Sequence, residues 1–376
     1  MNKTLPQQQS FEDLLAQAQS LVPLKDMTRV HLLELLKDNA TAHVFRGQVL
    51  FEAGSYDQSY IYLLHGDIEL QFEDGLSEIV KGRSALFPLV PLLPRPCRAI
   101  ALSDSRVLKV DAQQLDRLLA WSQIADYLQL QIADQPDLDE DAEWMMKIVR
   151  SNLFSKVPPT NIEQIFSRLT PQSVDAGDVI LRQGELGDGC YFIQEGQARV
   201  TQSAHKDSEW VADIGVGRCF GEDALVNETV RNATVTMATP GVLLRLEKQD
   251  FLALLREPEI PRVSFETLLK QSDTYTLIDV RTEGEYSEGH LEGAANIPVN
   301  FLPLQTRQLD KSHHYVTCCN SGRRSDAIAF LLRQQGFQVS SLTEGLRKLY
   351  SSGAAFQRRD YILKNGRAVP ASSLVC

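Results

Sequence analysis

The stretch TCCNSGRRS, residues 317–325, decides the fold of the last third of this 376-residue chain. It follows a β-branched apolar run that is typical of a strand. After it, apolar residues recur at helical spacing from Ala327 to Leu332, until Gly336 ends the pattern. The sequence therefore predicts a strand, a short loop and a helix, with Cys319 in the loop.

This loop favours the binding of an anion. The first amides of a helix have no partner within the helix, and the helix N-terminus carries partial positive charge. We expect these amides and two arginine side chains to surround the sulfur of Cys319, and such surroundings favour the reactive thiolate. The candidate catalytic residues are therefore Cys319, Asn320, Ser321, Gly322, Arg323 and Arg324.

Upstream, the segment DVRTEGEYSEGHLEGAANIP, residues 279–298, reads as a strand end, a polar turn and helix, and a second short strand. With CNSGRRS (319–325) and LTEGLRKLY (342–350), it resembles a rhodanese sulfurtransferase domain over residues 262–355. The resemblance implies an α/β domain with a parallel sheet. It also implies that the cysteine takes a sulfane sulfur from thiosulfate or a related donor, as a persulfide, and passes it to a thiol or cyanide acceptor.

Three other residues match the first motif of the rhodanese family and are expected to be structural. These are Asp279, Arg281 and His290. We expect Arg281 to pair with Glu285, and His290 to fix a turn.

Two alternatives for the cysteine loop stay open. Four residues separate Cys319 from Arg324, which suits a persulfide sulfur, whereas the five between Cys318 and Arg324 match a phosphatase or arsenate reductase loop. Cys318 continues the strand and is expected to point into the sheet, so Cys319 is favoured as the nucleophile. Because many rhodanese-like domains are inactive, the other alternative is a non-catalytic, cyclic-nucleotide-responsive scaffold whose loop docks a partner.

A second motif lies in the middle of the chain. Residues 173–202 place glycines between short alternating strands, which predicts a small antiparallel β-roll. The following segment FGEDALVNETVRNATV, residues 220–235, resembles the phosphate-binding cassette of cyclic-nucleotide-binding domains. A glycine allows close backbone approach, a short helix offers amides to a phosphate, and an arginine supplies a bidentate charge partner.

The resemblance implies a nucleotide site made of Gly221, Glu222, Ala224, Arg231 and Asn232. Glu222 would accept from the ribose 2′-hydroxyl and Arg231 would bind the phosphate. Asn232 departs from the small or hydroxyl residue of the family, so base preference stays open, with cyclic AMP favoured over cyclic GMP. A purine dinucleotide, or a structural cassette in which Glu222 and Arg231 pair with each other, are the alternatives.

The first third of the chain repeats the second, since residues 44–70 parallel residues 174–200 with their glycines aligned. Continuing this alignment places Arg98 opposite Arg231, whereas Pro88 and Leu89 replace Gly221 and Glu222. Prolines at 88, 91, 94 and 96 are expected to prevent a cassette helix. The first roll is therefore expected not to bind a nucleotide.

The expected fold is multidomain, with two cyclic-nucleotide-binding-type β-rolls and flanking helices (α+β), followed by an α/β rhodanese-like domain. The expected boundaries are 1–130 for the degenerate first roll with its N-terminal helices, 131–150 for a linker and helix, 151–258 for the second roll, 262–355 for the rhodanese-like domain and 356–376 for a polar tail. The segment 248–269, broken by Pro258 and Pro261, is the expected relay between nucleotide and enzyme.

Composition and charge limit the functions and cellular locations that the protein can have. A net charge of -11 argues against a broad nucleic-acid surface, and the sequence shows neither a signal peptide nor a membrane span. We expect a cytoplasmic protein without covalent cofactor or metal, whose partners are a small sulfur donor, a thiol acceptor and a cyclic nucleotide. Rolls of this kind often pair through the helix that follows them, which allows for a homodimer. We expect Cys97, Cys190 and Cys219 to be bystanders and Cys376 to be exposed.

Overall fold

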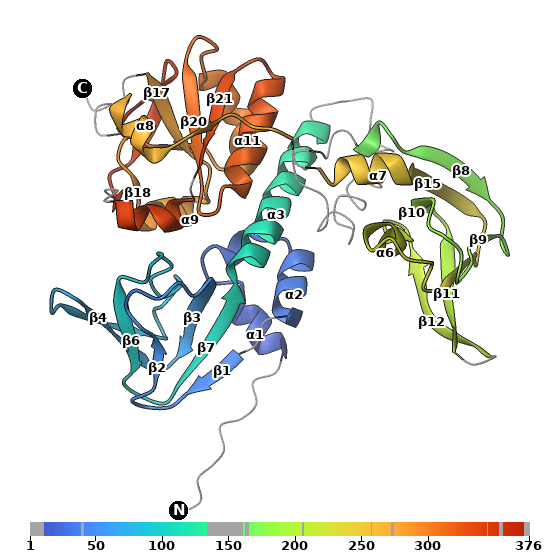
Figure 1. The fold of residues 1–376 in the computed structure, drawn as a ribbon, viewed down its shortest axis with the longest axis horizontal. Coiled ribbons are helices and arrows are strands. Elements are labelled where there is room, and N and C mark those ends of the chain that lie inside the picture. The colour runs from blue at the N-terminus through green and yellow to red at the C-terminus, as the bar shows by residue number, and fades with distance from the viewer. Residues whose placement is uncertain are drawn as a thin grey trace, which may run out of the picture. The chain divides into compact units, whose positions relative to one another are not determined.

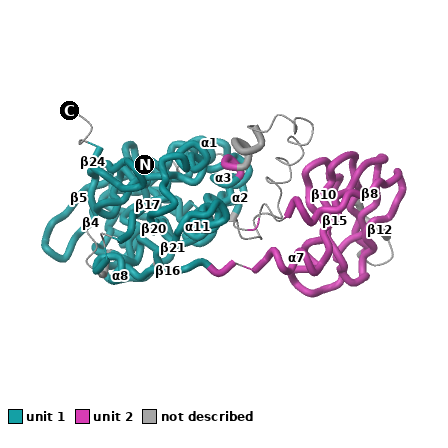
Figure 2. Tube along the Cα trace, turned by 90° about the horizontal axis from the view of Figure 1, so that it is seen from above, with its two compact units in different colours: residues 1–124, 260–376 teal, residues 125–259 magenta. Residues whose placement is uncertain are grey.

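The computed structural model describes residues 11–38, 41–133, 161, 165–204, 207–256, 258–271, 274–343, 345–352 and 356–371. The chain forms two compact units, one of residues 1–124 and 260–376 and one of residues 125–259 (Figure 2). The first roll and the C-terminal domain therefore belong to one unit. The expected linker at 131–150 lies almost entirely outside the described residues.

The first roll is built from two antiparallel sheets with the strand orders β1-β7-β3 and β2-β6-β4-β5 (Figure 1). Alternate residues of the strands, such as Leu63, Ile68 and Leu70, form its apolar core. Its strands are β1 Thr41–Val44, β2 Val49–Phe51, β3 Ser59–His65, β4 Asp67–Phe72, β5 Ser77–Lys81, β6 Cys97–Ala101 and β7 Ser105–Asp111; its helices are α1 Phe11–Ala18, η1 Leu24–Asp26, α2 Arg29–Asp38 and α3 Ala112–Ala133.

The loop between β5 and β6 contains the four prolines and is described throughout. No helix forms in it, as the prolines predicted.

The second roll repeats this plan, with the strand orders β13-β10-β15-β8 and β12-β11-β14-β9. Its core contains Leu181, Ile193, Val235 and Leu243. The strands are β8 Thr170–Val174, β9 Val179–Leu181, β10 Gly189–Glu195, β11 Gln197–Ala204, β12 Asp207–Gly215, β13 Cys219–Phe220, β14 Thr234–Met237 and β15 Gly241–Glu247; the helices are α6 Glu222–Val226 and α7 Lys248–Leu254. Unlike the first roll, this one has a short cassette helix, α6, directly after β13.

The C-terminal domain is built around a five-stranded parallel sheet of order β16-β21-β20-β17-β19. β20 is central and its residues from Tyr315 to Cys318 are buried, and the loop that follows it lies at the carboxyl edge of the sheet. The strands are β16 Arg262–Val263, β17 Tyr275–Asp279, β18 His290–Leu291, β19 Ala295–Asn296, β20 His314–Cys318 and β21 Gln338–Leu342; the helices are α8 Phe265–Lys270, α9 Glu283–Glu288, η3 Val299–Phe301, α10 Leu302–Gln305, η4 Thr306–Gln308, α11 Arg323–Gln334 and η5 Leu346–Ser352.

The end of the chain corrects one expectation, because residues 356–371 are not a tail. They form β22 Phe356–Gln357, which pairs with β18, and a hairpin of β23 Tyr361–Lys364 and β24 Arg367–Pro370. Asn365 and Gly366 both have positive φ, as a two-residue hairpin turn requires. The Gly366 carbonyl accepts from Thr276 at 3.0 Å, which ties the hairpin to the sheet.

Candidate functional site

The two neighbouring cysteines occupy different environments. Cys318 is the last residue of β20 and packs with Leu277 and Val316 in the core, where burial raises the pKa of its thiol well above the ordinary value. Cys319 follows the strand in the loop and is itself 1% exposed. The sequence predicted that the strand ends at Cys318, and the structure accordingly has Cys318 in the core and Cys319 in the loop.

The loop holds the sulfur of Cys319 through backbone and hydroxyl groups. The Gly322 amide donates to Sγ at 3.1 Å, and the Ser325 hydroxyl lies 3.4 Å from Sγ. Ser325 also donates to the Gly322 carbonyl at 2.8 Å, which closes the turn at the start of α11. Gly322 has φ of 99°, a left-handed conformation that a side chain would strain.

Arg324 is the most buried charge of the loop. Its guanidinium forms a bidentate pair with Glu285 at 2.6 and 2.9 Å, and lies 3.5 Å from Asp116 on α3. Burial raises the pKa of Glu285, but the charge and hydrogen bonds of Arg324 outweigh it and leave that pKa lowered. Burial also raises the pKa of Asp116, and the nearby Arg324 reduces that shift only in part.

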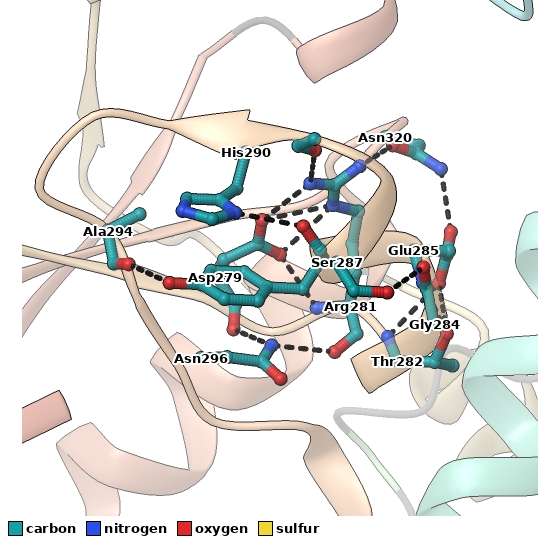
Figure 3. A network of polar contacts seen from close by, with 12 residues as sticks. Asp279, Arg281, Thr282, Gly284, Glu285, Ser287, His290, Ala294, Asn296 and Asn320 are labelled. Atoms are coloured by element: carbon teal, nitrogen blue, oxygen red, sulfur yellow. Dashed lines mark hydrogen bonds and ion pairs between the residues drawn. The ribbon is translucent and has the colours of Figure 1, made fainter. Parts of the chain in front are cut away.

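The expected pair of Arg281 with Glu285 is wrong. Arg281 instead binds Asp279 through Nε at 3.1 Å and Nη2 at 2.7 Å, and donates to Asn320 at 3.2 Å (Figure 3). Arg281 lies two residues after Asp279, the last residue of the buried strand β17, so its side chain can fold back onto that carboxylate. Glu285 instead forms a capping box with Thr282 at the start of α9. Asn320 therefore bridges the two networks, since it also donates to Glu285 at 2.7 Å.

His290 has a structural role, as expected. Its ring stacks on Tyr286 at 3.6 Å between centroids, and its two nitrogens lie 2.8 Å from the carbonyl oxygens of Tyr286 and Arg359. The ring thereby joins α9 to the segment before β23. Of the other loop residues, Ser321 is exposed and Arg323 is partly buried at the first position of α11.

Within the same unit, the first roll contacts this loop directly. Tyr60 accepts from Asn320 at 3.1 Å, and Arg347 of η5 stacks over the Tyr60 ring at 4.5 Å. Arg347 also donates to the Pro91 carbonyl at 2.8 Å and accepts from the Leu93 amide at 2.8 Å. Together with Asp116 and Arg324, these residues form what we call the roll–loop contact. Sequence reasoning missed it, because its partners are far apart in the chain and no motif marks them.

The residues of the expected nucleotide site gather around α6 in the second roll. Gly221 has φ of 88° at the start of this helix, and a Cβ there would lie 2.9 Å from the Arg231 guanidinium. Arg231 is 3% exposed; it donates to the carbonyls of Gly221 and Gly189 at 2.6 and 2.7 Å and pairs with Asp188 at 3.0 Å. Glu222 and Ala224 are buried on α6, and Asn232 is exposed. The arginine is thus held in place by Gly221 of the cassette and by Asp188 and Gly189 at the start of β10.

In the first roll, the counterpart of Arg231 is Arg95 and not Arg98 as the repeat alignment predicted. Arg231 exchanges backbone hydrogen bonds with Gly184 and Glu185, and Arg95 does the same with Gly54 and Ser55. Arg95, like Arg231, is buried, and it donates to the carbonyls of Ser59, Leu89 and Val90. The alignment of Arg98 with Arg231 is therefore wrong, because the proline loop changes the spacing. Arg98 pairs with Glu52 on the surface at 3.0 Å, as a surface charge would.

Three features of the described residues limit other functions. No group of histidine, cysteine, aspartate or glutamate side chains in them is arranged to hold a metal ion. None of their helices combines the length and apolar character needed to cross a bilayer. Cys97, Cys190 and Cys219 are buried, whereas Cys376 lies outside the described residues.

Comparison with family models divides the chain as its motifs do. Residues 42–121 and 171–257 each match the cyclic nucleotide-binding domain, and residues 264–352 match the rhodanese-like domain. The sequence prediction of two cyclic-nucleotide-binding-type rolls followed by a rhodanese-like domain is thereby confirmed.

Curated relatives match part of the chain. A cGMP-dependent protein kinase of Caenorhabditis elegans, egl-4, is 24% identical over 69% of this chain and 32% of its own length. A cyclic nucleotide-gated potassium channel of Rhizobium etli is 38% identical over 32% of each chain. The chain thus spans about a third of the length of these relatives.

Among solved structures, the regulatory domain of Toxoplasma gondii PKA with cAMP is 20% identical over 66% of this chain and 94% of that chain, with a TM-score of 0.27.

Proposed function

We propose that this chain, which contains two cyclic nucleotide-binding domains and a rhodanese-like domain, is a sulfurtransferase regulated by a cyclic nucleotide. The observation that carries the proposal is the position of Cys319. Its sulfur lies in a loop at the carboxyl edge of the sheet, with an amide donor at 3.1 Å and a buried arginine in the same loop. Cys318, in the core, lacks this setting and is not a nucleophile here.

The proposed reaction is a double displacement. The thiolate of Cys319 attacks the outer sulfur of thiosulfate, the sulfur–sulfur bond breaks, and sulfite leaves with its electron pair. A second nucleophile, a thiol or cyanide, then attacks the outer sulfur of the Cys319 persulfide and releases the thiolate. The Gly322 amide, which donates to Sγ in the resting loop, stabilises the anionic sulfur in both states.

Arg324 acts mainly by positioning the loop. Its guanidinium pairs with Glu285 and Asp116, so its charge is already neutralised. Arg324 therefore fixes the position of the loop and does not bind the donor. Asn320 links that framework to Arg281. We therefore assign Arg324, Glu285 and Asn320 to the positioning of the nucleophile.

The second roll is the proposed receiver, with cyclic AMP favoured as its ligand. A buried Arg231 and a glycine of positive φ at the start of α6 support a phosphate site, and Glu222 at the first position of α6 supports a ribose contact. The first roll lacks both the glycine and the helix, so we propose that it binds no cyclic nucleotide.

Regulation requires that the nucleotide favours one arrangement of the chain over another. Cys319 is 1% exposed, and the roll–loop contact lies against its loop, so a donor reaches the sulfur only after this contact loosens. Both α3, which carries Asp116, and the expected relay of residues 248–269 run from one unit to the other. We propose that these two segments carry the effect of the nucleotide.

The chemistry is tested by persulfide formation on the purified chain. After thiosulfate treatment, intact mass spectrometry should show one added sulfur on the wild type and on Cys318→Ala, and none on Cys319→Ser. If Cys318→Ala also loses the sulfur while its fold, checked by circular dichroism, is intact, the assignment of the nucleophile is wrong. If no variant gains sulfur but a partner is retained, the docking function is favoured instead.

The receiver is tested by calorimetric titration with cyclic AMP and cyclic GMP. Arg231→Leu should abolish binding, because it removes the buried phosphate partner. The matched control is Arg199→Leu, which removes an exposed arginine of the same roll that pairs with Asp213 on the surface. Equal affinity in Arg231→Leu and wild type would rule out the proposed cassette.

A further inference from the structure

The unit that contains the first roll and the rhodanese-like domain has a cavity, open to solvent on one side, beside the cysteine loop. Its volume is about 560 Å³, within the range of small-molecule sites. It is lined from one side by the proline loop and strands of the first roll, and from the other by Asn320, Arg281, Glu285 and Arg347. A thiosulfate ion has five heavy atoms and would leave most of this volume empty.

The wall of the cavity is mostly apolar. Apolar side chains come from the segment before η1, from β4 and β5, from the proline loop and from the C-terminal domain. They include Val22, Leu70, Val80, Leu86, Leu89 and Phe356. Leu86 is 46% exposed, although it is a large apolar residue. Such a wall suits an apolar body and gives a polar metabolite little to bind.

One charged group at the cavity has an unused donor. Arg347 is 6% exposed, and its Nη2 nitrogen is buried without a hydrogen-bond acceptor in the described part of the chain. Its Nε is used by the Pro91 carbonyl, and its plane lies over Tyr60. A buried donor of this kind is costly unless an acceptor arrives, so it indicates an anionic ligand.

Of the other charged residues of the wall, Glu78 and Lys81 are exposed on β5, and the remaining three are paired within the protein. Glu285 is paired with Arg324, Arg281 with Asp279, and Glu288 with Arg358 at 3.2 Å. Figure 3 shows Arg281 and Glu285 both turned toward Asn320, which adjoins Cys319 in the chain. The anionic end of a ligand at Arg347 would therefore lie beside the cysteine loop.

We infer that this cavity binds an organic anion with an apolar body, and that the physiological sulfur donor belongs to this class. The inference deepens the sulfurtransferase proposal and rests on it for the donor role. The sulfur-donor form of such an anion is an alkyl thiosulfonate. In the transfer step, the Cys319 thiolate attacks the outer sulfur, the bond between the two sulfurs breaks, and a sulfinate leaves with the electron pair.

Binding is tested without turnover, on the full chain carrying Cys319→Ser. Straight-chain alkanesulfonates, from methane- to octanesulfonate, are titrated by calorimetry at constant ionic strength. Each added methylene should raise the affinity about fourfold until the cavity is filled, which is the value of one buried methylene. An affinity independent of chain length would overturn the inference.

Two variants in this background separate the anion contact from the apolar contact. Arg347→Met should weaken every sulfonate at least tenfold, whereas Arg307→Met, at an exposed arginine outside the cavity, should change nothing. Leu86→Trp should abolish the dependence on chain length and spare methanesulfonate. Because Leu86 is partly exposed, this second variant keeps the test valid if Arg347→Met fails to fold.

The donor role is tested with active protein. Hexanethiosulfonate should give a kcat/KM at least tenfold above that of thiosulfate, and Leu86→Trp should reduce the ratio of the two kcat/KM values toward one. Equal kcat/KM for both donors would overturn the donor role. If no donor yields a persulfide, the sulfurtransferase proposal fails, while sulfonate binding to Cys319→Ser would still establish the cavity as an anion site.

Discussion

Replacement of Glu285 by glutamine should be the most damaging single change in the loop framework. Glu285 is 7% exposed and accepts from Arg324 twice, from Asn320 at 2.7 Å, and from the backbone and hydroxyl of Thr282, each at 3.1 Å. Removing one partner of a buried ion pair costs about 3–5 kcal/mol, because the other charge stays buried. Asp116, at 3.5 Å, compensates Arg324 in part, so we expect about 3 kcal/mol.

The loss should be measured by urea unfolding of wild type, Glu285→Gln and the control Glu288→Gln. Glu288 pairs with Arg358 on the surface, so the control should lose less than about 0.5 kcal/mol. In thermal unfolding, about 3 kcal/mol corresponds to roughly 6–12 °C for a unit of this size. A loss below about 1 kcal/mol in Glu285→Gln would refute the reasoning, since it would mean that the pair stabilises little.

The pH dependence of this difference has a definite sign. The pKa of Glu285 is held below its ordinary value of 4.5, because Arg324 and the hydrogen bonds outweigh the effect of burial. Its contribution to stability is therefore complete above the unfolded pKa and is lost as the pH falls through the folded pKa. The gap between wild type and Glu285→Gln should accordingly shrink in acid. A gap that widens below about pH 4.5 would contradict the lowered pKa.

Three further changes test the surroundings of the loop. Tyr60→Phe removes one hydrogen bond of the roll–loop contact, worth about 0.5–1.5 kcal/mol. Alkylation of the Cys319 thiol by iodoacetamide should therefore become about twofold to tenfold faster. An unchanged rate would mean that the roll–loop contact does not shield Cys319. Burial raises the pKa of Asp116 above its ordinary value of 3.8, so wild type should gain stability as the pH falls from neutral toward that value. Asp116→Asn should gain less over the same range in urea unfolding. Arg95→Met leaves three carbonyls of the first roll without their donor and should cost at least about 2 kcal/mol in the same assay, whereas Arg98→Met should cost under about 0.5 kcal/mol.

Local patterns predicted the elements and the loop, because they depend on residues close together in the chain. The strand through Cys318, the turn at Gly322 and the cassette at Gly221 each follow from a few adjacent residues. The same holds for the missing helix in the proline loop. The Asn365–Gly366 hairpin carried an equally local signal, which the reading of residues 356–376 as a polar tail overlooked.

Pairings between distant residues could not be predicted in this way. Arg281 and Glu285 lie at a spacing that suits a helical ion pair, yet a buried Asp279 and the buried Arg324 compete for them. The competitor Arg324 is 39 residues from Glu285, so no window of sequence contains both. The contact of Tyr60 with Asn320, 260 residues apart, depends on how two domains pack within one unit.

The repeat alignment failed for a different physical reason. In the first roll, the proline loop replaces a cassette helix, so the number of residues between corresponding strands of the two rolls differs. Counting along the chain therefore assigns the wrong arginine. The backbone hydrogen bonds of Arg95 with Gly54 and Ser55 identify the true counterpart of Arg231. Hydrogen-bond register was therefore more informative than residue count.

The central claim is that one chain joins a nucleotide receiver to a sulfurtransferase. The most direct measurement is thiosulfate-to-cyanide sulfur transfer by the purified protein, with and without saturating cyclic AMP, in wild type and Arg231→Leu. We predict a rate that depends on the nucleotide in wild type and is independent of it in the variant. A wild-type rate unchanged by a nucleotide that is shown to bind, or a response that survives in Arg231→Leu, would contradict the account.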